Sequence, residues 1–364
     1  MNKIKAFLAR KGVVCSFRQY GVDALGAMAQ GLFCTLLVGT ILNTLGQQLH
    51  IGFLTAPVVS VGTVSYTVGG LASAMVGPGI AVAIGSALHC PPLVLFSLIP
   101  VGFAANAMGG AGGPLAVYAV TIIAAELGKL VSKETRIDIL VTPCVTVIAG
   151  IAVAQLIAAP IGTAARAVGL AIMWATELQP FFMGVLVSAL IGIALTLPIS
   201  SAAICAAFGL TGLAGGAAVA GCCAQMVGFA VMSFKENRWG GLVAQGVGTS
   251  MLQMPNILKN PCIWIPPTLA SMITGPLATC VFHLQMNGSP VSSGMGTCGF
   301  VGQIGVYTGW VSDIAAGTKA AITPMDWIGL VLICFILPAV LSTLFCCVLE
   351  KRGWIREGDM KLDL

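Results

Sequence analysis

Charged side chains are scarce in this 364-residue chain. Asp, Glu, Lys and Arg make up only 8% of it, whereas a soluble globular domain carries about 25%. Residues 24–125 contain none. Hydrophobic residues amount to 57% of the chain, which is more than a globule of this size can bury. Lipid is therefore the expected solvent, and the composition predicts an all-α polytopic membrane protein.

Motifs that carry enzyme chemistry are also missing. The chain has three histidines, and its 13 cysteines show no CxxC spacing and no metal-ligand cluster. Most cysteines lie in apolar stretches, where we expect small buried hydrophobes. The glycine-rich segments lack the lysine of a phosphate loop. We therefore expect no catalytic residues, no metal, no cofactor and no nucleic acid partner; the chain is at most a subunit of an enzyme.

Apolar stretches of about 20 residues predict about ten transmembrane helices. They form two halves of five, with broken or re-entrant segments. One of these expected spans is 51–75. The segment 294–311 is too short and glycine-rich for a plain span and is expected to be a re-entrant or interfacial loop. The expected organisation is an N-terminal segment, a first membrane repeat, a linker, a second membrane repeat and a tail, at 1–19, 20–160, 161–177, 178–349 and 350–364.

Lysine and arginine set the expected orientation. The N-terminal segment, the loop 129–138 and the C-terminal tail are basic, so all three are expected in the cytoplasm. The loops 46–50 and 106–112 are then external. With ten spans, the segment KENR (235–238) also lies outside. If 201–233 is a hairpin instead of one span, KENR moves to the cytoplasmic side.

The two halves resemble each other in sequence. GLFCTLLVGTILNTL (31–45) matches GVLVSALIGIALTLP (184–198) at an offset of 153 residues, and SALHCP (86–91) matches SMLQMP (250–255) at 164. GPLA recurs at an offset of 162. Two halves with an odd number of spans each must be inverted in the bilayer, which is the design of many secondary transporters.

The repeat suggests where a solute would bind. In such folds, substrate sites form where helices of the two halves are interrupted near the midplane. Proline removes a backbone donor and frees a carbonyl group. An imidazole or an amide beside such a break suits a sugar, because each donates and accepts hydrogen bonds. The repeat places His89 and Gln253 at equivalent positions, and these two residues are the first candidate ligands. The helix breaks beside them are at Pro91, Pro92, Pro255 and Pro261. His89 could equally be a packing histidine.

Further polar residues are also candidate solute ligands, and for each of them a structural role is the alternative. Asn106 precedes a glycine-rich turn and could contact a ligand or another helix, and Asn256 flanks the second break. Ser200 and Ser201 follow a proline and could bind solute or bond carbonyls freed at the kink. Glu177 could cap a helix start, where a carboxylate is favoured, bind a sugar hydroxyl or carry a proton.

Three long segments resemble a known family. They are ELQPFFMGVLVSALIGIALTLPISSAAI (177–204), NPCIWIPPTLASMITGPLA (260–278) and GSPVSSGMGTCGFVGQIG (288–305). The chain is similar to the second, smaller EIIC family of the phosphotransferase system, which includes a clostridial membrane regulator of perfringolysin O. The resemblance implies a bacterial inner membrane, a sugar substrate, separate soluble components that phosphorylate the sugar, and a homodimer.

Two other functions remain open at this point. One is an ion-coupled or uncoupled transporter of another small solute, which the scarcity of intramembrane carboxylates weakens. The other is a membrane sensor or regulator that signals through a partner protein.

Overall fold

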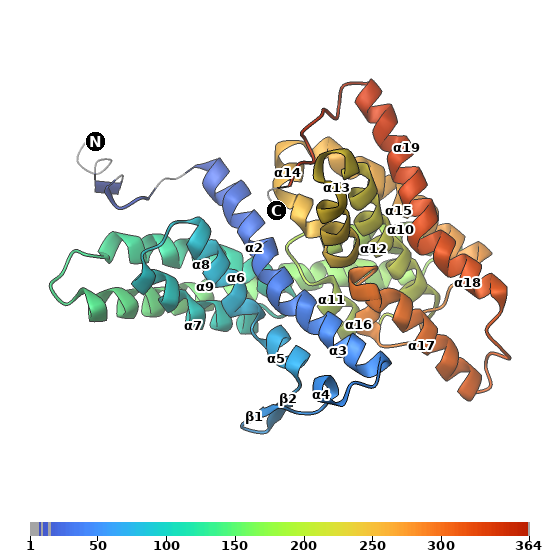
Figure 1. The fold of residues 1–364 in the computed structure, drawn as a ribbon, viewed down its shortest axis with the longest axis horizontal. Coiled ribbons are helices and arrows are strands. Elements are labelled where there is room, and N and C mark those ends of the chain that lie inside the picture. Colours follow the sequence, from blue (N-terminus) through green and yellow to red (C-terminus); the bar gives the residue numbers. More distant parts are fainter. Residues whose placement is uncertain (1–6, 9, 14–15, 363–364) are drawn as a thin grey trace. The chain divides into compact units, whose positions relative to one another are not determined.

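The chain folds almost entirely into helices, as Figure 1 shows. The structure is a computed structural model that describes residues 7–8, 10–13 and 16–362. It forms two compact units, Met1–Ala165 and Arg166–Leu364. The boundary falls within the expected linker 161–177, which is helical as far as Thr176.

Unit 1 is a set of packed helices with one small hairpin of strands. Its elements in chain order are η1 (Arg18–Asp23), α2 (Ala24–Leu32), η2 (Phe33–Leu37), α3 (Val38–Gln48), α4 (Gly52–Thr55), β1 (Val59–Val61), β2 (Val64–Tyr66), α5 (Val68–Ala74), α6 (Val76–Ala87), α7 (Pro92–Gly109), η3 (Gly110–Gly112), α8 (Gly113–Val131) and the first part of α9 (Asp138–Thr176).

Helices α7 and α8 fold back on each other. Gly110 has a φ of 53°, a left-handed conformation that costs glycine little, and the chain reverses there. At the far end of the pair, a Cβ built on Gly128 would lie 2.8 Å from a methyl group of Val94. Glycine at such positions lets helix backbones approach closely, as in many membrane helix pairs.

The expected span 51–75 is wrong. Val59–Val61 and Val64–Tyr66 form an antiparallel two-stranded hairpin, with Ser60 opposite Ser65, and most of it is exposed. The helices of this region are short, the single turn α4 and the seven-residue α5, and α5 continues into α6 with a bend of 54°.

Unit 2 contains more short and irregular helices than unit 1. Its elements after α9 are α10 (Pro180–Thr196), α11 (Ser201–Ala207), α12 (Gly212–Met232), α13 (Phe234–Val243), η4 (Ala244–Gly248), η5 (Ser250–Gln253), α14 (Met254–Lys259), η6 (Pro261–Trp264), α15 (Ile265–Pro276), η7 (Leu277–Val281), α16 (Pro290–Ser293), η8 (Cys298–Phe300), α17 (Val301–Ala315), α18 (Pro324–Val331), η9 (Leu332–Ile336) and α19 (Leu337–Lys351).

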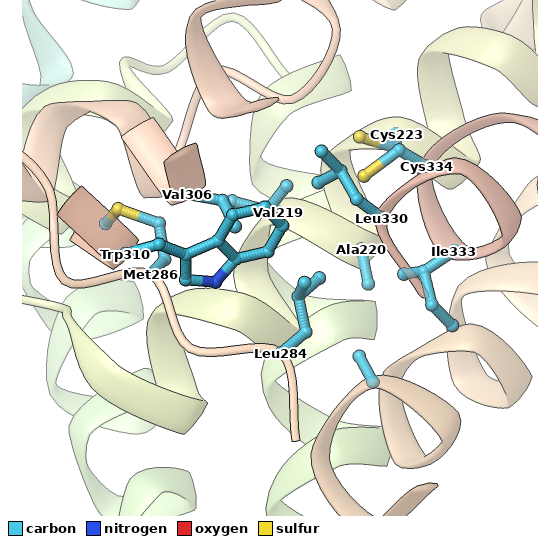
Figure 2. Packing of buried hydrophobic residues seen from close by; sticks show 11 residues of the cluster. Val219, Ala220, Cys223, Leu284, Met286, Val306, Trp310, Leu330, Ile333 and Cys334 are labelled. Carbon is cyan, nitrogen blue, oxygen red and sulfur yellow. The ribbon is translucent and has the colours of Figure 1, made fainter. Parts of the chain in front are cut away.

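Helix α12 is the centre of unit 2. It packs against α10, α15 and α19, and most of its residues are buried. A helix that is apolar all round belongs in the interior. Figure 2 shows part of this core, in which Trp310 of α17 lies among Val219, Leu284 and Met286.

The segment 201–233 is a hairpin and not a single span. Helix α11 ends before Gly209, where φ is 61°. Ser201, at the start of α11, and Cys222, in α12, pack against Gly294 and Gly296, so the chain reverses between them. Leu210, in the turn, accepts a hydrogen bond from Ser293 at 2.6 Å. The two sequence expectations for this region, one bent span or a hairpin, are thereby decided in favour of the hairpin.

The glycine-rich segment 294–311 folds back into the core, which favours the re-entrant one of the two alternatives, a re-entrant or an interfacial loop. Residues 290–300 run beside α12, where Thr297 contacts the sulfur of Met226 at 3.5 Å. Helix α17 then returns in the opposite direction, and Gly309 packs against Asn287, just before the start of this segment. Residues 292–298 are buried, so protein covers the irregular backbone, as such a loop requires within a membrane.

The C-terminal tail folds back onto the KENR segment. Glu236 accepts hydrogen bonds from the backbone of Gly358 and Met360 at 2.9 and 3.1 Å, and Asn237 accepts one from Leu362 at 2.8 Å. KENR and the tail therefore lie at one end of unit 2, which we call the tail end. The expectation that KENR lies on the opposite side of the membrane from the tail is wrong.

Five helical stretches among the described residues are long and apolar enough to cross a membrane, or six with the bent α5–α6 pair. One of the five, Pro92–Val131, contains the antiparallel α7 and α8. The structure thus confirms a helical, polytopic architecture. The number ten and the inversion of the two halves stay predictions.

Candidate functional site

The first proline break is a turn between α6 and α7. His89 is exposed, with a φ of 53°, and its backbone N–H donates to Ser86 at 2.9 Å. Pro91 is the N-cap of α7, and Pro92 is its first residue. The carbonyl of Leu88 accepts a hydrogen bond from Lys129 at 3.4 Å. The break therefore lies at the charged end of unit 1 and not within a helix.

The second break lies in a buried polar cluster. Gln253 is fully buried, and its Nε2 donates to Gln245 Oε1 at 2.8 Å and to the Met360 carbonyl at 3.0 Å. Asn256 Nδ2 donates to Gln253 Oε1 and to the Lys361 carbonyl, both at 2.9 Å. These amides bind one another and the backbone of the C-terminal tail. A buried amide needs such partners.

The prolines of the second break shape short helices. Pro255 lies in the first turn of α14, and Pro261 starts η6. Between them, Asn260 Nδ2 donates to Trp354 at 2.8 Å and to Asp359 at 2.7 Å, which attaches the start of the tail. The positions that the repeat equates, His89 and Gln253, thus differ: one is an exposed turn residue and the other is a buried amide.

Asn106 and His89 lie at opposite ends of α7. His89 lies in the turn before α7, and the 14 helical positions from Pro92 to Asn106 span about 21 Å at 1.5 Å per residue. Asn106 packs where Gly77 and Gly113 leave room for it. One small solute cannot contact both side chains at once.

Glu177 does not cap α10. It is exposed in the turn after α9, and the N-cap of α10 is Gln179, whose side chain makes no capping bond. Ser200, in contrast, is the N-cap of α11 and accepts from the backbone of Ala203 at 3.2 Å. Ser201 donates to the carbonyl of Gly294 at 2.8 Å and so joins the two interrupted segments of unit 2.

A buried amide that sequence analysis missed lies in the middle of unit 2. Gln225 Oε1 accepts from Trp264 Nε1 at 3.0 Å and from Thr196 at 3.3 Å, and its Nε2 donates to Thr268 at 3.2 Å. Thr196 also shares a hydrogen bond of 2.8 Å with Ser250. The signal was present in AGCCAQMVGFA, where one amide stands alone in an apolar helix.

An open polar pocket lies at the other end of unit 2, which we call the pocket end. Helix α12 connects the two ends, since Gly212 pairs with Met286 and Met232 precedes KENR. The pocket has a volume of about 430 Å³. Its lining residues are Phe282, His283, Gln285, Asn287, Trp310, Asp313, Thr318, Lys319 and Asp326.

The polar groups of this pocket are held by hydrogen bonds. Asn287 Nδ2 donates to Asp313 Oδ2 at 2.8 Å and to Gln285 at 3.2 Å, while its Oδ1 accepts from Gly212 at 3.1 Å. Lys319 pairs with Asp326 at 2.9 Å. Among the described residues, no hydrogen bond engages Asp313 Oδ1. The pocket therefore offers a carboxylate oxygen and amides beside an indole.

Sequence analysis did not find this pocket, although the pattern was visible. In HLQMN (283–287), polar and apolar residues alternate, and the structure shows an extended segment whose Leu284 and Met286 are buried. Alternation with period two is typical of a strand with one buried face. His283 and Gln285 are exposed and Asn287 is partly buried, and all three line the pocket.

The comparison with protein-family models decides the family. The model described as phosphotransferase system, EIIC, matches residues 22–362. The chain belongs to this family. It is therefore an integral membrane protein and a membrane component of the phosphotransferase type. No curated protein and no solved structure matches the chain.

Proposed function

We propose that this EIIC-family protein carries a neutral sugar across a bacterial cytoplasmic membrane by alternating access, and that the sugar first binds in the pocket of unit 2. A separate soluble protein would phosphorylate the sugar, because this family is that of the membrane component. A homodimer is part of the proposal through the family resemblance alone.

The donor set of the pocket supports a polyhydroxylated ligand. Asp313 and Asn287 are fixed side by side at 2.8 Å, a spacing at which two groups can bond neighbouring hydroxyls. Trp310 supplies an aromatic surface that suits the apolar face of a sugar ring. The volume of about 430 Å³ lies within the usual range for small ligands, about 300–1,000 Å³.

The charges in the pocket favour a neutral ligand over an anionic one. Lys319 is paired with Asp326 and lies 5.8 Å from the centre of the Trp310 ring. Asp313 then leaves one negative charge in the lining, which disfavours phosphates and carboxylic acids. An unmodified sugar is thus a better fit than a sugar phosphate.

The distribution of basic residues in unit 2 supports entry of the sugar from outside the cell. The tail end of unit 2 carries a set of basic residues, whereas Lys319 lies at the pocket end. By the positive-inside rule, the tail end faces the cytoplasm and the pocket faces the outside. The basic residues of the tail end are Lys235, Arg238, Lys259, Lys351, Arg352, Arg356 and Lys361.

A binding experiment on the full chain in detergent or nanodiscs tests the pocket. A panel of unmodified sugars is screened by thermal shift, and the affinity of the best one is measured by calorimetry. Asp313→Asn should weaken binding about tenfold to a hundredfold, since a hydrogen bond to a charged group contributes about 1.5–3 kcal/mol. Glu357→Gln removes the same charge from the exposed tail and is the matched control. Equal affinities of the two variants for that sugar would contradict the pocket assignment.

A further inference from the structure

A second polar pocket lies in unit 1, at the end that carries the first proline turn. Its volume is about 380 Å³. Cationic side chains from three separate segments reach it: the N-terminal segment, the end of α8 and the loop after α8. The lining residues are Arg10, Lys11, Pro91, Lys129, Ser132, Lys133 and Glu134.

Specific contacts hold this pocket together. Arg10 pairs with Glu134 at 2.8 Å, and Lys11 pairs with the same carboxylate. Lys129 is nearly fully buried, and its ammonium donates to the Gly12 carbonyl at 3.1 Å. The same ammonium also donates to the Leu88 carbonyl at 3.4 Å, so Lys129 links the N-terminal segment to the proline turn.

The pocket has more positive than negative charge. Lys129 has a carboxylate partner, Glu126, at 2.8 Å, in an ion pair without the angle of a hydrogen bond. The four cations that line the pocket thus face two carboxylates, Glu126 and Glu134. Asp138 lies outside the lining, but its Oδ1 accepts a hydrogen bond from the Lys133 backbone at 2.7 Å and its charge interacts with Lys11 and Lys133. In the total charge, Arg136 of the same loop offsets Asp138. A surplus of two positive charges remains.

The helix dipole adds to this surplus. Pro91 lines the pocket and is the N-cap of α7, an 18-residue helix. The N-terminal end of a helix carries a partial positive charge and favours anions. The arginine guanidinium and the lysine ammonium group are the usual protein partners of phosphate.

We propose that this pocket binds a phosphoryl group. A phosphate monoester carries close to two negative charges at pH 7, which matches the surplus. Glu134 is the competing anion: hydrogen bonding from Lys11 and the charges of Arg10 and Lys11 hold the pKa of its carboxyl below the usual value. Two of the cations, Arg10 and Lys11, precede residue 22, where the family match begins. The inference does not rest on the proposed sugar pocket.

Two sources could supply this chemistry: a soluble phosphate ester or the headgroup of an anionic lipid. The first experiment titrates inorganic phosphate and a hexose 6-phosphate, at constant ionic strength, into the full chain in phosphatidylcholine nanodiscs. Lys133→Gln should weaken binding about three- to tenfold, less than for a buried contact because Lys133 is exposed. Arg136→Gln changes the same charge in the same loop, outside the lining, and should bind as wild type does. Glu134→Gln should bind several-fold more tightly.

The second experiment measures retained phosphatidylglycerol by native mass spectrometry of the same three proteins and of the wild type. The site binds a lipid headgroup if the wild type and Arg136→Gln retain the lipid, Lys133→Gln loses it, and the soluble phosphate ligands do not bind. Binding of the soluble ligands with the expected order of variants assigns it to a phosphate ester. If neither ligand binds, or if Lys133→Gln and Arg136→Gln lose binding equally, the proposal is wrong. Neither result depends on whether Asp313→Asn alters sugar affinity.

Discussion

Gln253 and Met360, 107 positions apart in the chain, are joined by a hydrogen bond of 3.0 Å from the amide Nε2 to the backbone carbonyl. This bond closes the C-terminal tail over the second proline break. Met360 is almost completely buried. The tail is thus part of the core of unit 2 and not a loose extension.

The first prediction separates two roles of Gln253. Because its amide is bonded to the tail, Gln253→Ala should leave buried partners unsatisfied, at about 1–3 kcal/mol, and loosen the tail. Hydrogen exchange of residues 355–362 should rise in this variant and stay unchanged in His89→Ala. If both variants instead weaken sugar binding and leave tail exchange unaltered, the sequence-based prediction that His89 and Gln253 are sugar ligands gains support.

The second prediction concerns packing beneath the sugar pocket. A Cβ on Gly216 would overlap the carbonyl oxygen of Leu284, in the extended segment that carries the pocket's polar residues. Gly216→Ala should destabilise the protein by about 1–3 kcal/mol, as overpacking does, and weaken sugar binding. Gly246→Ala, where the new Cβ would lie 3.4 Å from Ala230, is the control. Equal melting temperatures of the two variants would show that α12 and the extended segment are not packed as described.

The third prediction concerns the buried amide of α12. Gln225→Leu removes the acceptor of Trp264 and a hydrogen-bond partner of both Thr196 and Thr268. An unsatisfied buried donor costs about 1–3 kcal/mol, so the melting temperature should fall by several degrees. Gln48→Leu, at an exposed helix end, should melt within a degree or two of the wild type. A stable Gln225→Leu protein would mean that the network is dispensable.

The fourth prediction concerns sidedness. In a cysteine-free background, Lys133→Cys and Lys235→Cys should be labelled from the cytoplasm, whereas Ser60→Cys and Ala316→Cys should be labelled from outside. The first pair lies at the basic ends of the two units, and positive charge marks the cytoplasmic side. Labelling of Lys133→Cys and Lys235→Cys from opposite sides would rule out this orientation.

The fifth prediction is a pH dependence of the N-terminal contact. The hydrogen bond from Lys11 and the nearby charges lower the pKa of Glu134 below its usual value of 4.5. A lowered pKa means that the contact stabilises the docked N-terminus above pH 4.5 and is lost as the pH falls through the folded value. A spin label on Leu8→Cys should stay immobile between about pH 5 and 8. With Glu134→Gln the mobility of the label should not change as the pH falls below 4.5, because Lys11 and Lys129 still hold the segment through the Ser132 and Gly12 carbonyls. Release of the wild-type segment near pH 6 would be inconsistent with this pKa direction.

Composition and hydropathy predicted the membrane class and the helical architecture, and they left 294–311 as a re-entrant or an interfacial loop. These properties depend on averages over many residues, which a single sequence contains. The grouping of the N-terminal segment with the loop 129–138 was also predicted from charge, and Arg10 contacts Glu134.

The failures have local physical causes. VVSVGTVSY (58–66) alternates around a Gly-Thr turn, which is a hairpin pattern, but its high hydropathy suggested a span. Gln253 and Asn256 bond backbone atoms of the tail about 105 residues away. Neither residue spacing nor composition indicates hydrogen bonds between segments so far apart in the chain. Glu177 failed as a cap because Gln179 and Pro180 start the helix two residues later.

Sugar uptake by cells tests the central claim most directly. The protein is expressed with and without the soluble phosphotransferase components, and the sugar found by the thermal-shift screen is supplied with a radiolabel. The account predicts that label accumulates inside as the phosphate ester, only with the soluble components present, and falls at least tenfold with Asp313→Asn but not with Glu357→Gln. Accumulation of unmodified sugar at the full rate without those components would contradict it.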